Sequence, residues 1–198
     1  MPVGIIASPT HVRGWITSVG FETGDRFLVG DWRESLLGRT IDVMRITPDG
    51  ERHLLVPDED SAAFITSIYV FDEVHVAPLT VEGDGRSTRV AGHRLELVVH
   101  AGRLRPVPVP RPRWLTRYVE APIARALMGV HTYGVSPTGA RQWYQTRGWR
   151  WIHAASGRFD GSPLGELTDV ARPVGVGFTD PPLRPSIVAV RVAIHPPR

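Results

Sequence analysis

The amino-acid sequence predicts a mainly β protein: an antiparallel barrel-like or sandwich domain with one or two short helices packed on an end or edge. Short runs of alternating apolar and polar residues recur along the chain, separated by turns that contain Gly and Pro. Only two segments have the apolar spacing of a helix. Because no repeat of fixed period is found, we expect a single domain over residues 1–198, divided, if at all, at the Pro- and Arg-rich connector 101–113.

Composition places the chain among globular proteins and excludes several kinds of chemistry. Hydrophobic residues make up 42% and charged residues 22%, enough apolar side chain to close a core. Cysteine is absent, which excludes disulfides, thiolate nucleophiles and iron–sulfur clusters. All basic side chains besides histidine are arginine, so a Schiff-base lysine and a P-loop lysine are excluded as well. The codon usage of a GC-rich genome is the simplest explanation for this bias.

The net charge of +3 is unevenly distributed along the chain. Residues 1–100 contain 9 Arg and 15 acidic residues, whereas residues 101–198 contain 14 Arg and 5 acidic residues. We expect the acidic half to dock on the basic half, with a basic surface for an anionic partner as the alternative. No signal-like segment and no apolar run of about 18 residues is present, which favours a cytoplasmic location.

Local patterns predict the first strands of the fold. Residues 15–21 and 26–32 have strand-like composition and are separated by a turn-rich tetrapeptide. Residues 40–47 and 51–56 predict a hairpin, because in the intervening Pro48-Asp49-Gly50 the proline presets φ and the glycine accepts a positive φ.

A short helix is predicted next. The segment Asp58-Glu59-Asp60-Ser61 precedes apolar residues between 62 and 68, which is typical of a helix whose first turn carries carboxylates. A metal or catalytic role for these acidic residues is the alternative, and capping is the stronger interpretation. Strands are expected again within 69–81 and over 93–100.

The second half begins with a proline-rich connector. Alternating prolines in residues 101–113 remove backbone donors and favour an extended, polyproline-like shape. Residues 114–128 predict the longest helix, with apolar residues at i, i+4 spacing and Gly129 as its end. The remaining strands are expected over residues 130–135, 141–146, 149–155, 174–178 and 186–194.

Aromatic residues are concentrated in the middle of this second half. If Arg147-Gly148 is a two-residue turn, the flanking strands form a hairpin in which Tyr144 pairs with Trp151. Gln142 then pairs with His153. The resulting wall of aromatic, amide and imidazole groups predicts a cavity for a small hydrophobic ligand. The predicted ligand-binding residues are Gln142, Tyr144, Trp149, Trp151 and His153.

A structural role for the same aromatic residues remains an alternative, since large rings also fill barrel interiors and stabilise cross-strand pairs. A His-dependent enzyme is a second functional alternative. His153 is its candidate acid or base, because aromatic neighbours lower a histidine pKa by desolvation. Catalytic residues therefore stay unassigned.

The eight histidines lack the helical spacing of paired metal ligands, and no cofactor-binding motif is found, so we predict neither a dedicated metal site nor a cofactor. Glu73 and His75 share a strand face and offer two ligands or an acid/base couple. The alternating Val74 and Val76 indicate instead that the polar pair faces solvent.

An arginine-rich segment over residues 103–118 supports a different function. Interleaved with Trp114 and Tyr118, it has the composition of a nucleic-acid or anionic-surface binding site. A solvated connector is the stronger interpretation, because charges on a proline-rich segment form no fixed groove. The candidate anion-binding residues are Arg103, Arg105, Arg111, Arg113 and Arg117.

Overall fold

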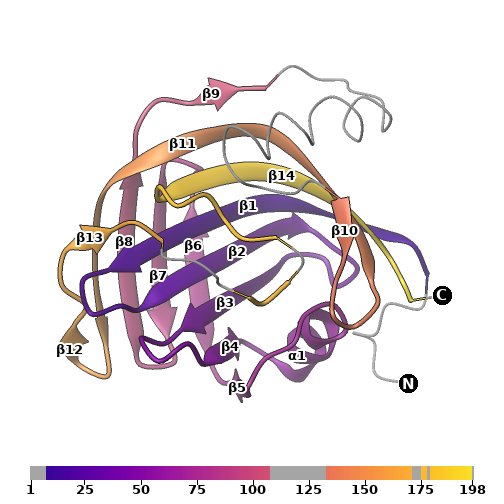
Figure 1. Ribbon diagram of the computed structural model, residues 1–198, viewed down its shortest axis with the longest axis horizontal. Coiled ribbons are helices and arrows are strands. Elements are labelled where there is room, and N and C mark those ends of the chain that lie inside the picture. Colours follow the sequence, from indigo (N-terminus) through magenta and orange to yellow (C-terminus); the bar gives the residue numbers. More distant parts are fainter. Residues whose placement is uncertain (1–7, 108–132, 171–174, 178, 198) are drawn as a thin grey trace.

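The computed structural model describes residues 8–107, 133–170, 175–177 and 179–197. In these residues the chain forms a curled, mixed sheet that closes into a half-barrel, with one short helix (Figure 1). The helix is α1 (Glu59–Thr66). The strands are β1 (Thr10–Phe21), β2 (Arg26–Glu34), β3 (Thr40–Ile46), β4 (Arg52–Val56), β5 (Glu73–Val76), β6 (Leu79–Gly83), β7 (Ser87–Gly92), β8 (Leu95–Ala101), β9 (Arg105–Pro106), β10 (Tyr133–Val135), β11 (Arg141–Phe159), β12 (Ser162–Pro163), β13 (Leu167–Thr168) and β14 (Ser186–His195).

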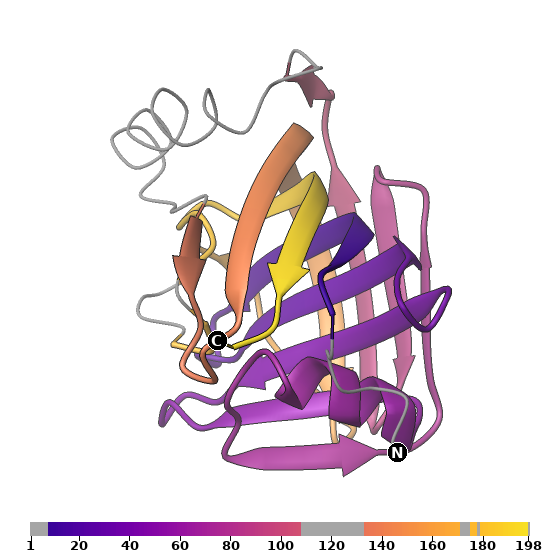
Figure 2. The ribbon, with the colours of Figure 1, turned by 90° about the vertical axis from the view of Figure 1, so that its right-hand side faces the viewer.

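The main path of the sheet runs in the order β5-β4-β3-β2-β1-β14-β11-β8-β7-β6. Neighbouring strands on this path are antiparallel except β4 and β5, which are parallel and are joined through α1. Strand β11 has 19 residues and pairs with β14 in its first part and with β8 in its second. Strand β11 therefore belongs to both parts of the curled sheet. As a result β6, β7 and β8 form a layer behind β1 to β3 (Figures 1 and 2).

Side-chain alternation on the central strands produces two cores, one on each face of the sheet. On β3, Val43 packs in the core shared with β6, β7 and β8, whereas Met44 packs in the core shared with α1. Phe27 and Trp32 on β2 divide between the two cores in the same way. In the core that contains Met44, α1 packs against β3, β4 and β5, and the residues that follow α1 belong to the same core.

The predicted mainly β class is confirmed, and so are two of its local elements. Strands β3 and β4 form the predicted hairpin, where Gly50 has a φ of 94° and its N–H donates to the Thr47 carbonyl oxygen at 3.0 Å. Helix α1 begins as predicted, because the Asp58 carboxylate accepts a hydrogen bond from the Ser61 N–H at 2.7 Å. No helix among the described residues is long and apolar enough to cross a membrane.

Two other predictions are wrong. Arg147-Gly148 is not a hairpin turn, because residues 141–159 form one continuous strand and the register shifts at a β-bulge between Thr146 and Gly148. The residues on both sides of this bulge pair with β14, so the strand continues in the same direction and does not turn back. Residues 175–177 form no strand. The helix predicted over 114–128 and residues 108–113 of the connector lie outside the described residues.

Candidate functional site

A pocket of about 120 Å³ lies on the face of the sheet that packs against α1. Strands β1, β2, β3, β11 and β14 line it from the sheet. The segment that follows α1, together with residues 176–177 and 179–182, completes its wall. Its lining is largely apolar and includes Ile16, Leu28, Met44, Val176, Val188 and Val190.

Two carboxyl groups, those of Asp42 and Asp180, interrupt the apolar wall, and Asp42 is the buried one of the two. Asp42 of β3 lines the pocket although its residue is only 2% exposed to solvent. The Trp32 indole Nε1–H donates a hydrogen bond of 2.6 Å to the Asp42 Oδ1. Gly30 lies opposite Asp42 on the neighbouring strand, and a Cβ at Gly30 would lie 2.5 Å from both atoms of this hydrogen bond. The absence of a side chain at this position therefore makes room for the pair.

Burial changes the acidity of this carboxyl. Desolvation raises the pKa of Asp42 from 3.8 to about 6, and the Trp32 hydrogen bond opposes this by favouring the charged form. Asp42 is therefore mostly ionised at neutral pH and becomes protonated in mildly acidic solution. A carboxylate in an apolar wall is a strong acceptor for a donor group that enters the pocket.

Two phenols form a second polar group at the pocket. Tyr69, just after α1, and Tyr144 of β11 both line the wall, and their hydroxyls are hydrogen-bonded to each other. The Gln142 Oε1 lies 2.9 Å from the Tyr69 hydroxyl oxygen and 3.3 Å from that of Tyr144. Because each phenol has a single O–H hydrogen, Tyr144 donates to Tyr69 and Tyr69 donates to the nearer Gln142 Oε1. Burial raises the pKa of Tyr69 well above 10 and that of Tyr144 to about 12. Both phenols are therefore neutral at physiological pH.

The structure brings part of the predicted ligand-binding set to this pocket. Tyr144 lines the pocket and Gln142 lies buried beside it, two residues away on the same face of β11. Trp149 and Trp151 lie farther along the strand, half-buried, with ring centroids 6.4 Å apart. Neither is among the described residues that line the pocket.

His153 lies in a different environment from the one predicted. It is exposed and lies within a second register shift, between Ile152 and Ala154, where β11 leaves β14 and pairs with β8. Among the described residues, His153 does not line the pocket. The predicted pairing of Gln142 with His153 is wrong, because Gln142 pairs with Ile194 of β14.

The residues that sequence reasoning missed are Asp42, Trp32 and Tyr69. The sequence held one local signal for Asp42. It lies in the middle of a strand, on the same face as Thr40, Met44 and Ile46. A carboxylate between buried positions of a strand indicates a buried charge that needs a partner.

The arginine-rich segment is described only in part. Arg103 and Arg105 are exposed, and the short strand β9 that contains Arg105 pairs with β11. Arg111, Arg113 and Arg117 lie outside the described residues. Binding of nucleic acid or an anionic surface by this segment stays a prediction.

We compared the chain with protein-family models, with curated proteins and with solved structures, and found no match. The chemistry of the pocket is therefore the basis for a functional proposal.

Proposed function

We propose that the chain binds a small, mostly apolar molecule that carries one hydrogen-bond donor. The proposal is supported above all by one observation: a buried carboxyl, Asp42, lies in the otherwise largely apolar wall of a pocket. Small-molecule sites combine a hydrophobic lining with a few polar groups that orient the ligand, and this wall has that composition.

The size of the pocket limits the ligand. Its volume of about 120 Å³ is slightly below the roughly 150 Å³ of an apolar protein cavity that holds benzene. A single ring or a short branched chain is therefore the largest apolar body that fits without a rearrangement of the wall.

The polar groups define the chemistry of the ligand's head. Asp42 is mostly a carboxylate at neutral pH, so a hydroxyl or amine of the ligand gains a charge-assisted hydrogen bond. Such a bond contributes about 1.5 to 3 kcal/mol, which corresponds to about tenfold or more in Kd. The ligand class is therefore a small alcohol, phenol or amine with an apolar body.

Phenol and fluorobenzene are suitable probes, because they have similar shapes and only phenol donates a hydrogen bond. Binding of fluorobenzene is followed by its fluorine NMR signal, and phenol is titrated as a competitor. We expect both to bind, with phenol about tenfold tighter or more. In the Asp42→Asn variant the preference for phenol falls while fluorobenzene binding is kept.

A variant that fills the pocket tests where the probes bind. Val188 lines the pocket, so Val188→Phe is expected to abolish binding of both probes. The matched control is Val135→Phe on β10, whose valine is 53% exposed. The proposal is wrong if neither probe binds at millimolar concentration, or if Val188→Phe binds them as well as the control does.

A further inference from the structure

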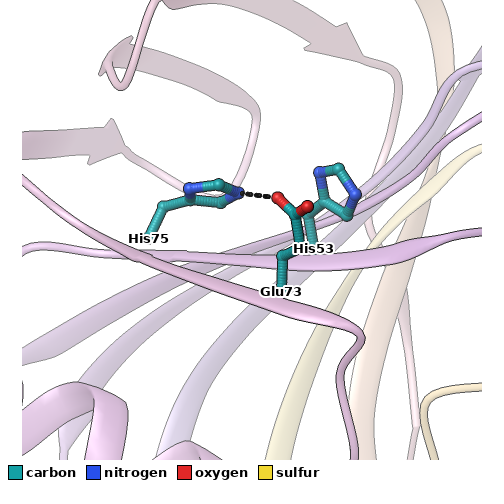
Figure 3. Close-up of side chains that lie close together, drawn as sticks. All are labelled: His53, Glu73 and His75. Atoms are coloured by element: carbon teal, nitrogen blue, oxygen red, sulfur yellow. Dashed lines mark ion pairs between the residues drawn. The ribbon is translucent and has the colours of Figure 1, made fainter.

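Two histidines and a glutamate from neighbouring strands come together at the edge of the sheet. His53 lies on β4, and Glu73 and His75 lie on β5 (Figure 3). Each residue contributes one potential ligand atom, and these atoms lie within 4.8 Å of one another. This is the only such group of three among the described residues.

The parallel pairing of β4 and β5 creates this arrangement. His53 lies directly beside Glu73, and Leu55 lies beside His75. Because alternate residues of a strand share a face, His53, Glu73 and His75 all project from the same face of the sheet. Helix α1 connects the two strands, so the histidines come together although 21 residues separate them in the chain.

The imidazole nitrogens already point toward carboxylates. His75 Nε2 lies 3.0 Å from a carboxylate oxygen of Glu73, as the dashed line in Figure 3 marks. His53 Nε2 lies 3.3 Å from a carboxylate oxygen of Glu51, and the two imidazole ring centroids are 5.5 Å apart. Two imidazoles and two carboxylates are therefore in contact at this edge of the sheet.

The nearby arginines are engaged by other acids. Arg52 forms an ion pair with Asp72, at 2.7 Å. Arg45, which lies beside His53 on β3, forms an ion pair with Asp25, at 2.8 Å. Both guanidinium groups thus have a carboxylate partner outside the group of His53, Glu73 and His75.

We propose that His53, Glu73 and His75 bind a divalent transition-metal ion of the zinc class. Two imidazoles and one carboxylate are ligands typical of zinc, and the imidazoles disfavour magnesium and calcium. Zinc bonds of 2.0 to 2.2 Å place two ligand atoms of a tetrahedral site about 3.4 Å apart. The present separations of up to 4.8 Å close to that value by side-chain rotation, since His75 is 43% and Glu73 55% exposed. The Glu51 carboxylate or water completes the coordination.

The site is independent of the proposed function. His53 projects from the same face as Leu55, which belongs to the core shared with β6 to β8, whereas Asp42 lines the pocket on the opposite face. A bound ion links β5, the edge strand of the sheet, to β4 by bonds between side chains. The sequence analysis considered Glu73 and His75 as a pair on one strand, and the parallel pairing with β4 places His53 beside them.

Isothermal titration of the chain without a histidine tag, treated with chelator and then dialysed, tests the proposal with Zn²⁺ as the probe. We expect one Zn²⁺ per chain. Glu73→Gln and His75→Ala should each weaken binding about tenfold or more, because even residues that only support metal ligands have effects of that size. The matched control is His100→Ala, which removes an exposed histidine of β8 outside the group and should leave the affinity unchanged.

Co²⁺ provides a second measurement, because its visible absorption reports the geometry and nitrogen ligation of the bound ion. The spectrum of the unsubstituted chain should be lost in His53→Ala, and circular dichroism of each variant establishes that it is folded. Absence of Zn²⁺ binding by the unsubstituted chain would overturn the proposal. Binding that persists unchanged in folded Glu73→Gln and His75→Ala would overturn it as well.

Discussion

The buried carboxyl of Asp42 predicts a stability that depends on pH in a defined direction. Its pKa rises from 3.8 to about 6 on folding. Below pH 3.8 the carboxyl is protonated in both the folded and the unfolded state, so it does not lower the unfolding free energy. Above the higher value the unfolded chain ionises freely whereas the folded chain must hold a buried charge, so Asp42 destabilises the fold. The penalty therefore develops as the pH rises between these two values.

The size of the effect follows from the same pair of values. A tenfold change in proton affinity corresponds to 1.36 kcal/mol, so the full penalty is about 3 kcal/mol. The substitution Asp42→Asn removes the charge and keeps an oxygen that accepts the Trp32 hydrogen bond. Its buried amide N–H groups carry a desolvation cost, and that cost is the same at every pH. The difference between two pH values therefore isolates the charge.

Urea denaturation of both chains at about pH 4 and about pH 8 measures this difference. Relative to the unsubstituted protein, Asp42→Asn should gain about 2.5 kcal/mol of unfolding free energy on going from the lower to the higher pH. Asp49→Asn, in the exposed turn between β3 and β4, is the matched control and should show almost no such change. An equal effect of Asp42→Asn at the two pH values would refute the assignment of a raised pKa.

Three further substitutions test the surroundings of the carboxyl. Trp32→Phe removes the hydrogen bond that lowers the pKa of Asp42, so carboxyl titration by NMR should show a higher pKa; an unchanged value would contradict the assigned role of the indole. Gly30→Ala should cost about 1 to 3 kcal/mol in unfolding free energy and weaken phenol binding, because its Cβ would lie 2.5 Å from the hydrogen-bonded atoms. Gly102→Ala is its control, since the nearest atom to a Cβ there is 3.8 Å away. Tyr69→Phe should lose about 1 kcal/mol in denaturant melts by removing a hydroxyl bonded to the buried glutamine of β11; no loss would indicate that this bond contributes nothing.

Sequence patterns predicted those elements whose determinants lie within a few residues. The hairpin of β3 and β4 depends on Pro48-Asp49-Gly50, and the start of α1 depends on Asp58, so the local sequence contains the whole physical cause. The same patterns failed at Arg147-Gly148, because a glycine next to a polar residue suits a turn and a bulge equally well. A bulge forms there because β14 pairs with the residues on both sides of that position.

The candidate site was predicted less completely than the fold, for a related reason. Tyr144 was predicted as a ligand-binding residue, and it does line the pocket, while ligand binding there stays a prediction. Asp42 was visible only as a polar residue among buried strand positions, and its indole partner on β2 came from a pairing that no local pattern specifies.

The sequence by itself determined the mainly β class, the absence of thiol and lysine chemistry, and the local turns and cap. These features depend on residue type and on short-range hydrogen bonds, which are the same in any fold that contains them. Only the tertiary structure decided that Asp42 is buried beside an indole and that His53 lies beside Glu73. Both results depend on which strands become neighbours and in what register, and strand pairing joins residues that are distant in the chain.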